Sequence, residues 1–169
     1  MSTSTLLLSL FRYKARADEE LLAELAALDP AAWQAQRHGA IRILNHVYVV
    51  DRIFAAHLSG RAHGYTGTNT AETPTLEVLS AAIAESDRWY VDHVAALEPD
   101  ALTERIAFTF TDGRGASMSR EEMLAHVATH AGYHRGAVGR AVPQLSTAPP
   151  RDTYTVYLHE TEPARRERG

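Results

Sequence analysis

Three histidines, His126, His130 and His134, stand four residues apart in the stretch 122–140. If this stretch is helical, four residues turn through roughly 400° and rise about 6 Å, so the imidazoles form one stripe. Two histidines at this spacing can direct nitrogens at the same metal ion with little distortion. The whole stripe spans about 12 Å, which is too long for one ion. Chelation by the first pair and chelation by the second pair therefore both remain open.

A helical pair supplies two ligands, and His46 is the best candidate for a third. It lies in the apolar run 41–50, on the face of its predicted helix that periodicity expects to be buried. A buried imidazole needs a polar partner, and one metal ion would satisfy three imidazoles at once. Three histidine ligands leave positions for water or substrate, which is typical of catalytic sites. The Glu-x-x-His pattern of di-iron bundles and the His-Glu-x-x-His pattern of metalloproteases are both absent.

Two charged residues near these histidines, Asp51 and Arg135, are further candidates for the site. Arg135 could orient a substrate carboxylate or phosphate, or form a salt bridge with an acid of the first or second predicted helix. Asp51 is one and a half turns from His46, so it points elsewhere and either joins a network with an arginine or faces solvent. His57 is three turns from His46 and cannot share its ion. The other histidines are expected at the solvated surface: His38, His63, His93 and His159.

Small residues lie roughly opposite the histidine stripe, at Ala128, Gly132, Gly136 and Gly139. Each glycine inside a helix costs up to about 1 kcal/mol relative to alanine. We therefore expect another helix backbone to approach closely there, from the first helix or from a symmetry-related chain.

The composition is that of one globular domain. The 169 residues are 45% hydrophobic and carry a net charge of −4, which gives no basis for nucleic-acid binding. No cysteine is present, so thiolate metal sites and disulfides are excluded and a metal would need nitrogen or oxygen ligands. We interpret the mildly apolar start as the first turns of a helix, because it lacks the pattern of a signal peptide. No apolar run could span a bilayer, and we expect a cytoplasmic protein.

Apolar periodicity and capping signals predict four helices, at about 6–28, 39–58, 73–97 and 119–142. Period-two alternation at 106–110, a turn at 111–115 and residues 116–118 predict a short β-hairpin, and a capping box at 119–122 opens the last helix. Residues from about 143 to 169 are expected to form an extended tail, with 154–159 as a short segment that could pack back. We predict an all-α four-helix bundle, in one domain spanning 1–169.

The sequence also resembles the DinB family, whose members are described as metalloenzymes. The resemblance lies in His-x3-His-x3-His-Arg-Gly at 126–136 with the hairpin and capping box before it, in the segment 43–52 with its histidine and aspartate, and in the tail at 149–158. It covers nearly the whole chain. The family implies an up-down-down-up four-helix bundle, often a homodimer, that binds a divalent metal ion.

The resemblance implies His46, His130 and His134 as metal ligands and leaves His126 without that role. Three imidazoles suit zinc and nickel alike. Better-understood relatives are thiol-dependent transferases or isomerases, in which the metal activates a low-molecular-weight thiol. The expected function is therefore a metal-dependent S-transferase, isomerase or hydrolase acting on a small molecule, with His126, Asp51 and Arg135 as catalytic candidates. The alternative is a stress-related homodimer that binds a metal or small molecule without catalysis.

Overall fold

The computed structural model describes residues 2–142 and 152–165, and this part of the chain is mostly helical. Four long helices are followed by a shorter one: α1 (Thr3–Ala27), α2 (Gln34–Leu58), α3 (Leu76–Ala96), α4 (Arg120–Ala141) and α6 (Tyr154–Thr161). Between α3 and α4 lie a 3-10 turn (Pro99–Thr103) and a two-stranded antiparallel sheet of β1 (Arg105–Thr109) and β2 (Gly115–Ser119). A second 3-10 turn, Pro163–Arg165, follows α6. The described residues thus contain five α-helices, where the sequence predicted four.

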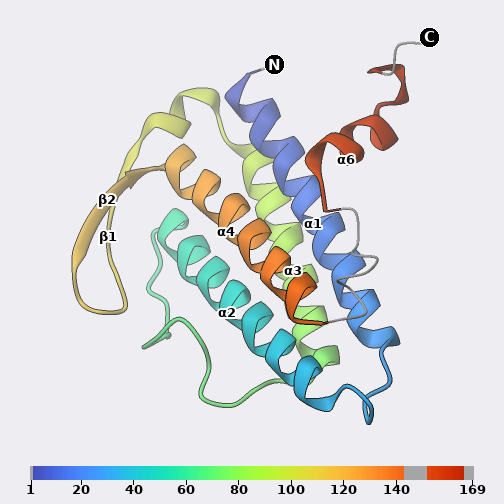
Figure 1. Ribbon diagram of the computed structural model, residues 1–169. Helices are drawn as coiled ribbons and strands as arrows, with labels where there is room; N and C mark the ends of the chain where they lie inside the picture. The colour runs from blue at the N-terminus through green and yellow to red at the C-terminus, as the bar shows by residue number, and fades with distance from the viewer. Residues whose placement is uncertain (1, 143–151, 166–169) are drawn as a thin grey trace.

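Two apolar clusters hold the long helices together and show their directions. One joins the start of α1 and α4 to the end of α2 and α3, through residues such as Phe11, Phe54, Tyr90 and Leu124. The other joins the end of α1 and α4 to the start of α2 and α3, at Leu25, Leu44, Leu79 and Val138. Consequently α1 and α4 run in one direction and α2 and α3 in the other. Figure 1 shows α4 beside α2, with α3 behind them.

Local capping sets where the helices begin. The Ser119 hydroxyl accepts a hydrogen bond from the Glu122 backbone N–H, and the Glu122 carboxylate accepts one from the Ser119 N–H, so the predicted capping box is confirmed. The predicted start of the third helix at Thr73 is wrong, because Thr75 is the residue whose side chain caps the Val78 N–H. The predicted start of the second helix is also too late by five residues, since α2 begins at Gln34.

The hairpin extends away from the helices beside the start of α4 (Figure 1). Its strands pair in register from Arg105 with Ser119 to Thr109 with Gly115. Gly113, with φ of 87°, occupies the left-handed position of the turn, where other residues are strained. Phe108 is the buried member of β1 and contacts Phe54 of α2, which attaches the sheet to the core.

The segment after α4 contains a helix where we expected mostly extended chain. The residues 154–159, predicted as a short segment, lie in α6 beside α1. The remainder of the predicted tail, 143–151 and 166–169, lies outside the described residues. None of the described helices is both long and apolar enough to cross a membrane.

The expected close approach of the first helix at the glycines of α4 is wrong, whereas approach by a symmetry-related chain stays a prediction. A Cβ placed on Gly136 or Gly139 would meet nothing within 4 Å, and on Gly132 its nearest contact would be the guanidinium of Arg135 at 3.7 Å. The described residues therefore show no backbone contact that these glycines permit.

Candidate metal centre

His46 of α2 and His130 and His134 of α4 come together in one cluster. Each can offer a ring nitrogen, and the three nitrogens lie within 4.8 Å of one another. The ring centroids are 5.0 Å apart for His46 and His130, 4.8 Å for His46 and His134, and 4.5 Å for His130 and His134. The side-by-side packing of α2 and α4 therefore assembles a three-nitrogen donor set from two helices (Figure 1). Of the two chelating pairs that the spacing left open, the 130/134 pair is the one that meets His46.

The hydrogen bonding of His46 directs one nitrogen toward the cluster. Its Nδ1 lies 2.7 Å from the carbonyl oxygen of Thr68. A carbonyl oxygen can only accept, so Nδ1 carries the proton and Nε2 presents a lone pair. That Nε2 lies 3.1 Å from Nε2 of His130. Histidine ligands commonly donate their other N–H to a backbone carbonyl, which fixes the ring and its tautomer.

Thr68 belongs to the α2–α3 loop (residues 59–75), and polar side chains of α2 hold this loop in place. The Asn45 amide donates to the Thr70 hydroxyl at 2.6 Å and also to the Asn69 side chain. Arg42 donates to the Thr70 carbonyl at 2.7 Å and accepts through its own carbonyl from Asn69 at 3.0 Å. These hydrogen bonds hold the loop where the Thr68 carbonyl faces His46 on the preceding helix.

His130 is the most perturbed member of the cluster. The pKa of His130 is lowered to about 3, mainly by burial and to a smaller extent by the neighbouring His134, His46 and His126. Burial and His46 also lower the pKa of His134. Both rings are therefore neutral at physiological pH and offer lone pairs, as metal ligation requires.

A cation fits this donor set better than hydrogen bonding does. His130 faces His46 through its Nε2, while its Nδ1, on the other side of the ring, is buried without a hydrogen-bond partner among the described residues. Because the Nε2 of His46 carries no proton, one N–H of His130 is the most that hydrogen bonding can provide between the two Nε2 atoms. Two nitrogens that bind one tetrahedral zinc at about 2.0–2.1 Å lie roughly 3.3 Å apart, close to the observed separation of 3.1 Å.

His126 continues the histidine stripe but lies outside the ligand group. Its ring stacks on His130 at 5.3 Å between centroids and meets the Phe54 ring at a tilt at 4.7 Å, and burial lowers its pKa. On the other side of the cluster, Tyr133 is 76% exposed and packs against the His134 ring at 5.1 Å. A neutral imidazole and an exposed phenol thus flank the three-histidine cluster.

The two charged candidates, Asp51 and Arg135, belong to a buried ion-pair network. The Lys14 Nζ lies 2.9 Å from Asp51, 2.9 Å from Asp18 and 2.6 Å from Asp87. Arg135 extends the network, with Nη1 3.0 Å from Asp18 and Nε 2.7 Å from Asp152. Of the two roles foreseen for Arg135, the structure shows the salt bridge to the first helix. Asp51 likewise joins a network, through Lys14, and does not face solvent.

Charge balance sets the protonation of this network. Burial alone would lower the pKa of Lys14, but its three carboxylate neighbours outweigh burial and raise it. Burial raises the pKa of Asp51 to about 6 and of Asp87 to about 7, against the opposing effect of Lys14. The pKa of Asp18 is lowered, because Lys14 and Arg135 together outweigh its burial.

Sequence reasoning missed Lys14 and its acids as a network, although a signal existed. Lys14 lies on the apolar stripe of the first predicted helix, four residues before Asp18. A charged pair on a core-facing stripe is a buried ion pair more often than a surface one, because an isolated buried charge is too costly. The partners on the other helices could not be read from the sequence.

Three of the remaining histidines depart from the expected solvated surface. His63 is half-buried, and its ring meets His57 at 5.1 Å. His93 is half-buried and stacks on Trp89 at 4.6 Å. His38 is exposed, as predicted, and His159 is half-buried in α6.

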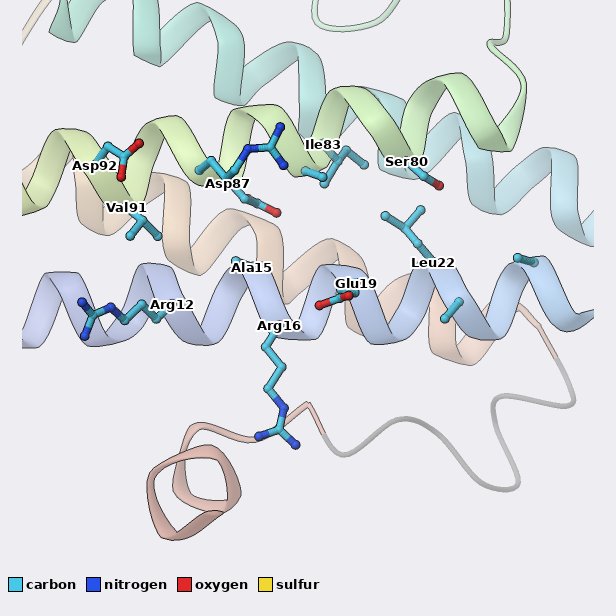
Figure 2. A pocket seen from close by; sticks show the side chains of 14 residues that line it. Arg12, Ala15, Arg16, Glu19, Leu22, Ser80, Ile83, Asp87, Val91 and Asp92 are labelled. Atoms are coloured by element: carbon cyan, nitrogen blue, oxygen red, sulfur yellow. The ribbon is translucent and has the colours of Figure 1, made fainter. Parts of the chain in front are cut away.

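A large hollow of about 760 Å³ lies between α1 and α3, away from the three histidines. Figure 2 shows its walls, with Leu22 and Ile83 facing each other and Arg12 and Asp92 near one end. Asp87 reaches into it from α3, whereas Arg16 extends away from it toward α6. Cations and acids are mixed along this hollow, and no histidine lines it.

The comparison with known protein families agrees with the geometry. Residues 1–167 match the family model described as DinB family. The match covers essentially the whole chain, including all three clustered histidines and α6. No curated protein and no solved structure matches the chain.

Proposed function

Because this chain belongs to the DinB family, we propose that it is a divalent-metal-dependent enzyme whose ion is held by His46, His130 and His134. One observation carries the proposal: three ring nitrogens from two helices lie within 4.8 Å of one another. The lowered pKa values of His130 and His134 support it because they favour neutral ligands, and the Thr68 contact supports it because it fixes the ring of His46.

A divalent ion bound there would supply Lewis-acid chemistry, which lowers the pKa of a thiol or water placed beside it. The residues around it have separate tasks in this proposal. Thr68 fixes the orientation of His46, and His126, whose pKa is lowered by burial and whose ring stacks on His130, is the group that would exchange a proton with a bound substrate. Tyr133 is exposed beside His134 and can contact the substrate's apolar part.

The reaction we propose is an S-transfer, isomerisation or hydrolysis of a small molecule, with a low-molecular-weight thiol as cosubstrate in the first two cases. Zinc and nickel are the proposed occupants, because three imidazoles bind both well. We further propose that α1–α4 form the family's four-helix bundle, that α6 is an addition to it, and that the protein is a cytoplasmic homodimer. Nothing in the net charge of −4 favours a nucleic-acid partner.

Metal content tests the proposal directly. Protein purified without an affinity tag should contain about one equivalent of zinc or nickel per chain by mass spectrometry, and His130→Ala should lose it. His38→Ala is the matched control, because His38 is an exposed histidine of α2 outside the cluster. Equal metal in wild type and His130→Ala, or none in the wild type after reconstitution, would contradict the proposed site. A screen of thiols and electrophiles that finds no metal-dependent turnover would reject the enzyme.

A further inference from the structure

A second hollow, of about 360 Å³, lies between the second half of α2, the loop after it and α3. Its volume falls within the roughly 300–1,000 Å³ typical of small-molecule sites. Two segments far apart in the sequence, 52–65 and 85–89, supply its polar and aromatic lining: Arg52, Arg61, His63, Tyr65, Glu85 and Trp89. Polar groups that converge on a concave site in this way are characteristic of ligand binding.

The charges that line this hollow favour an anion. No ion pair or hydrogen bond joins the guanidinium of Arg52 or of Arg61 to another described residue. Glu85 is the one acid among the lining residues, so two cations outnumber it. Guanidinium groups match the geometry of carboxylate and phosphate oxygens and bind them through paired N–H groups.

An unsatisfied imidazole points to the same conclusion. The Nδ1 of His63 is buried and has no hydrogen-bond partner among the described residues. The neighbouring His57 is not its partner either, since the buried Nε2 of His57 also has no hydrogen bond to a described residue. A buried polar atom left unpaired is costly, and a turn of the His63 ring that brings Nδ1 to a ligand oxygen in the hollow would relieve that cost. Beside His63, Tyr65 and Trp89 add aromatic surface to the wall.

We infer that this hollow is a binding site for a small oxyanion, a carboxylate or a phosphate, carried on a flat apolar group. Arg52 and Arg61 hold the anionic oxygens, His63 donates a further hydrogen bond, and Tyr65 and Trp89 contact the flat group. The site goes beyond the proposed metal function and does not depend on it. Both sites share one loop, since His63 and Tyr65 precede by a few residues the Thr68 carbonyl that orients His46.

Tryptophan fluorescence can test this site in the full-length protein. The chain has two tryptophans, so Trp33→Phe leaves Trp89 as the reporter in the wall of the hollow. Phenyl phosphate and benzoate are the probes, and benzyl alcohol is the uncharged control. We expect a saturable change with both anions and none with the alcohol. In this background, Arg52→Gln and Arg61→Gln should each weaken binding about tenfold, because each removes a charged hydrogen-bonding partner.

Two further variants separate the site from general charge effects. Arg114→Gln removes the same charge from an exposed position of the hairpin and should bind the anions as the parent does. Ala56→Leu adds bulk to the lining of the hollow without changing charge and should abolish binding, with helicity by circular dichroism as the check on folding. No saturable response to either anion, or equal binding by Arg52→Gln, Arg61→Gln and Ala56→Leu, would overturn the inference. Equal binding of benzyl alcohol would overturn the assignment to an oxyanion. Metal content is measured separately, so failure here leaves the metal proposal intact.

Discussion

Replacing Lys14 with methionine removes the one cation that three buried carboxylates share. The Lys14 side chain is 1% exposed, and its Nζ lies within 2.9 Å of oxygens of Asp18, Asp51 and Asp87. Methionine has a similar length and no charge, so the carboxylates would face one another without that cation. Breaking one buried ion pair costs about 3–5 kcal/mol. Since whole domains are stable by about 5–15 kcal/mol, we expect Lys14→Met to lose at least about 3 kcal/mol at pH 7.5.

The loss should shrink as the pH falls. Burial already raises the pKa of Asp51 to about 6 and of Asp87 to about 7, although Lys14 opposes both shifts. Without Lys14 these pKa values rise further, while unfolded aspartate titrates near pH 4. An acid whose pKa is raised by folding takes up a proton when the chain folds, so its penalty fades as the pH drops toward 4. Lys14 in the wild type stays charged throughout, because its pKa is raised above its usual range near 10.4.

Urea unfolding followed by circular dichroism at pH 7.5 and 5.5 measures both effects. Lys14→Met should recover part of its deficit at pH 5.5, and adding Asp87→Asn should restore stability at pH 7.5 by removing one unpaired carboxylate. Arg16→Met is the control, because Arg16 is partly exposed and forms two surface ion pairs, with Glu20 and Glu160, and each such pair contributes about 1 kcal/mol or less. A loss under about 1 kcal/mol at pH 7.5, or a loss that is the same at both pH values, would refute the reasoning.

Three further predictions concern the loop, the C-terminal segment and pH. Asn45→Ala should weaken zinc binding about tenfold in chelator competition, because it loosens the loop that presents the Thr68 carbonyl, whereas Thr66→Ala on the same loop should not. Asp152→Asn should cost about 2 kcal/mol in urea unfolding, because it weakens two hydrogen bonds to buried Arg135, whereas Glu160→Gln at an exposed pair should cost less than about 0.5 kcal/mol. Asp87→Asn should reduce the stability that the wild type gains between pH 8 and pH 5, since the pKa of Asp87 is raised to about 7 mainly by burial. The histidines with lowered pKa values oppose that gain in both proteins, so the difference between their urea midpoints isolates Asp87; an unchanged difference would contradict the assignment.

The sequence predicted the features that depend on neighbouring residues. Apolar periodicity located the long helices, period-two alternation located the hairpin, and Ser119 with Glu122 located the start of α4, because each signal lies within one element. Local signals also misled where two were close together, as with Thr73 and Thr75, both of which can cap a helix. The glycines of α4 suggested a helix contact that the described residues do not show. Helix propensity indicates that a glycine destabilises a helix, but it does not indicate which neighbour, if any, packs against that glycine.

The candidate site likewise has features that the sequence predicted and features that depend on how distant segments pack. Spacing showed that His130 could chelate with either neighbour on its stripe, but which pair meets His46 depends on the rotation of α4 against α2. Neither the Thr68 carbonyl nor the unpartnered Nδ1 of His130 could be foreseen, because both depend on how a loop and two helices pack. Lys14 was visible as a charge on an apolar stripe, yet its three acids come from three different helices.

The buried network and the histidine cluster constrain the same helix from different directions. His134 and Arg135 are adjacent in α4, so their side chains point about 100° apart around its axis. The first meets His46 of α2, while the second pairs with Asp18 of α1 and Asp152 beyond the helix. Turning α4 by one residue would break both ion pairs and direct the histidines away from His46. A rotation of α4 that the histidine cluster tolerated would therefore be resisted by the ion pairs of Arg135, and the reverse also holds. In this way a helix that contains three glycines can keep His130 and His134 aligned with His46.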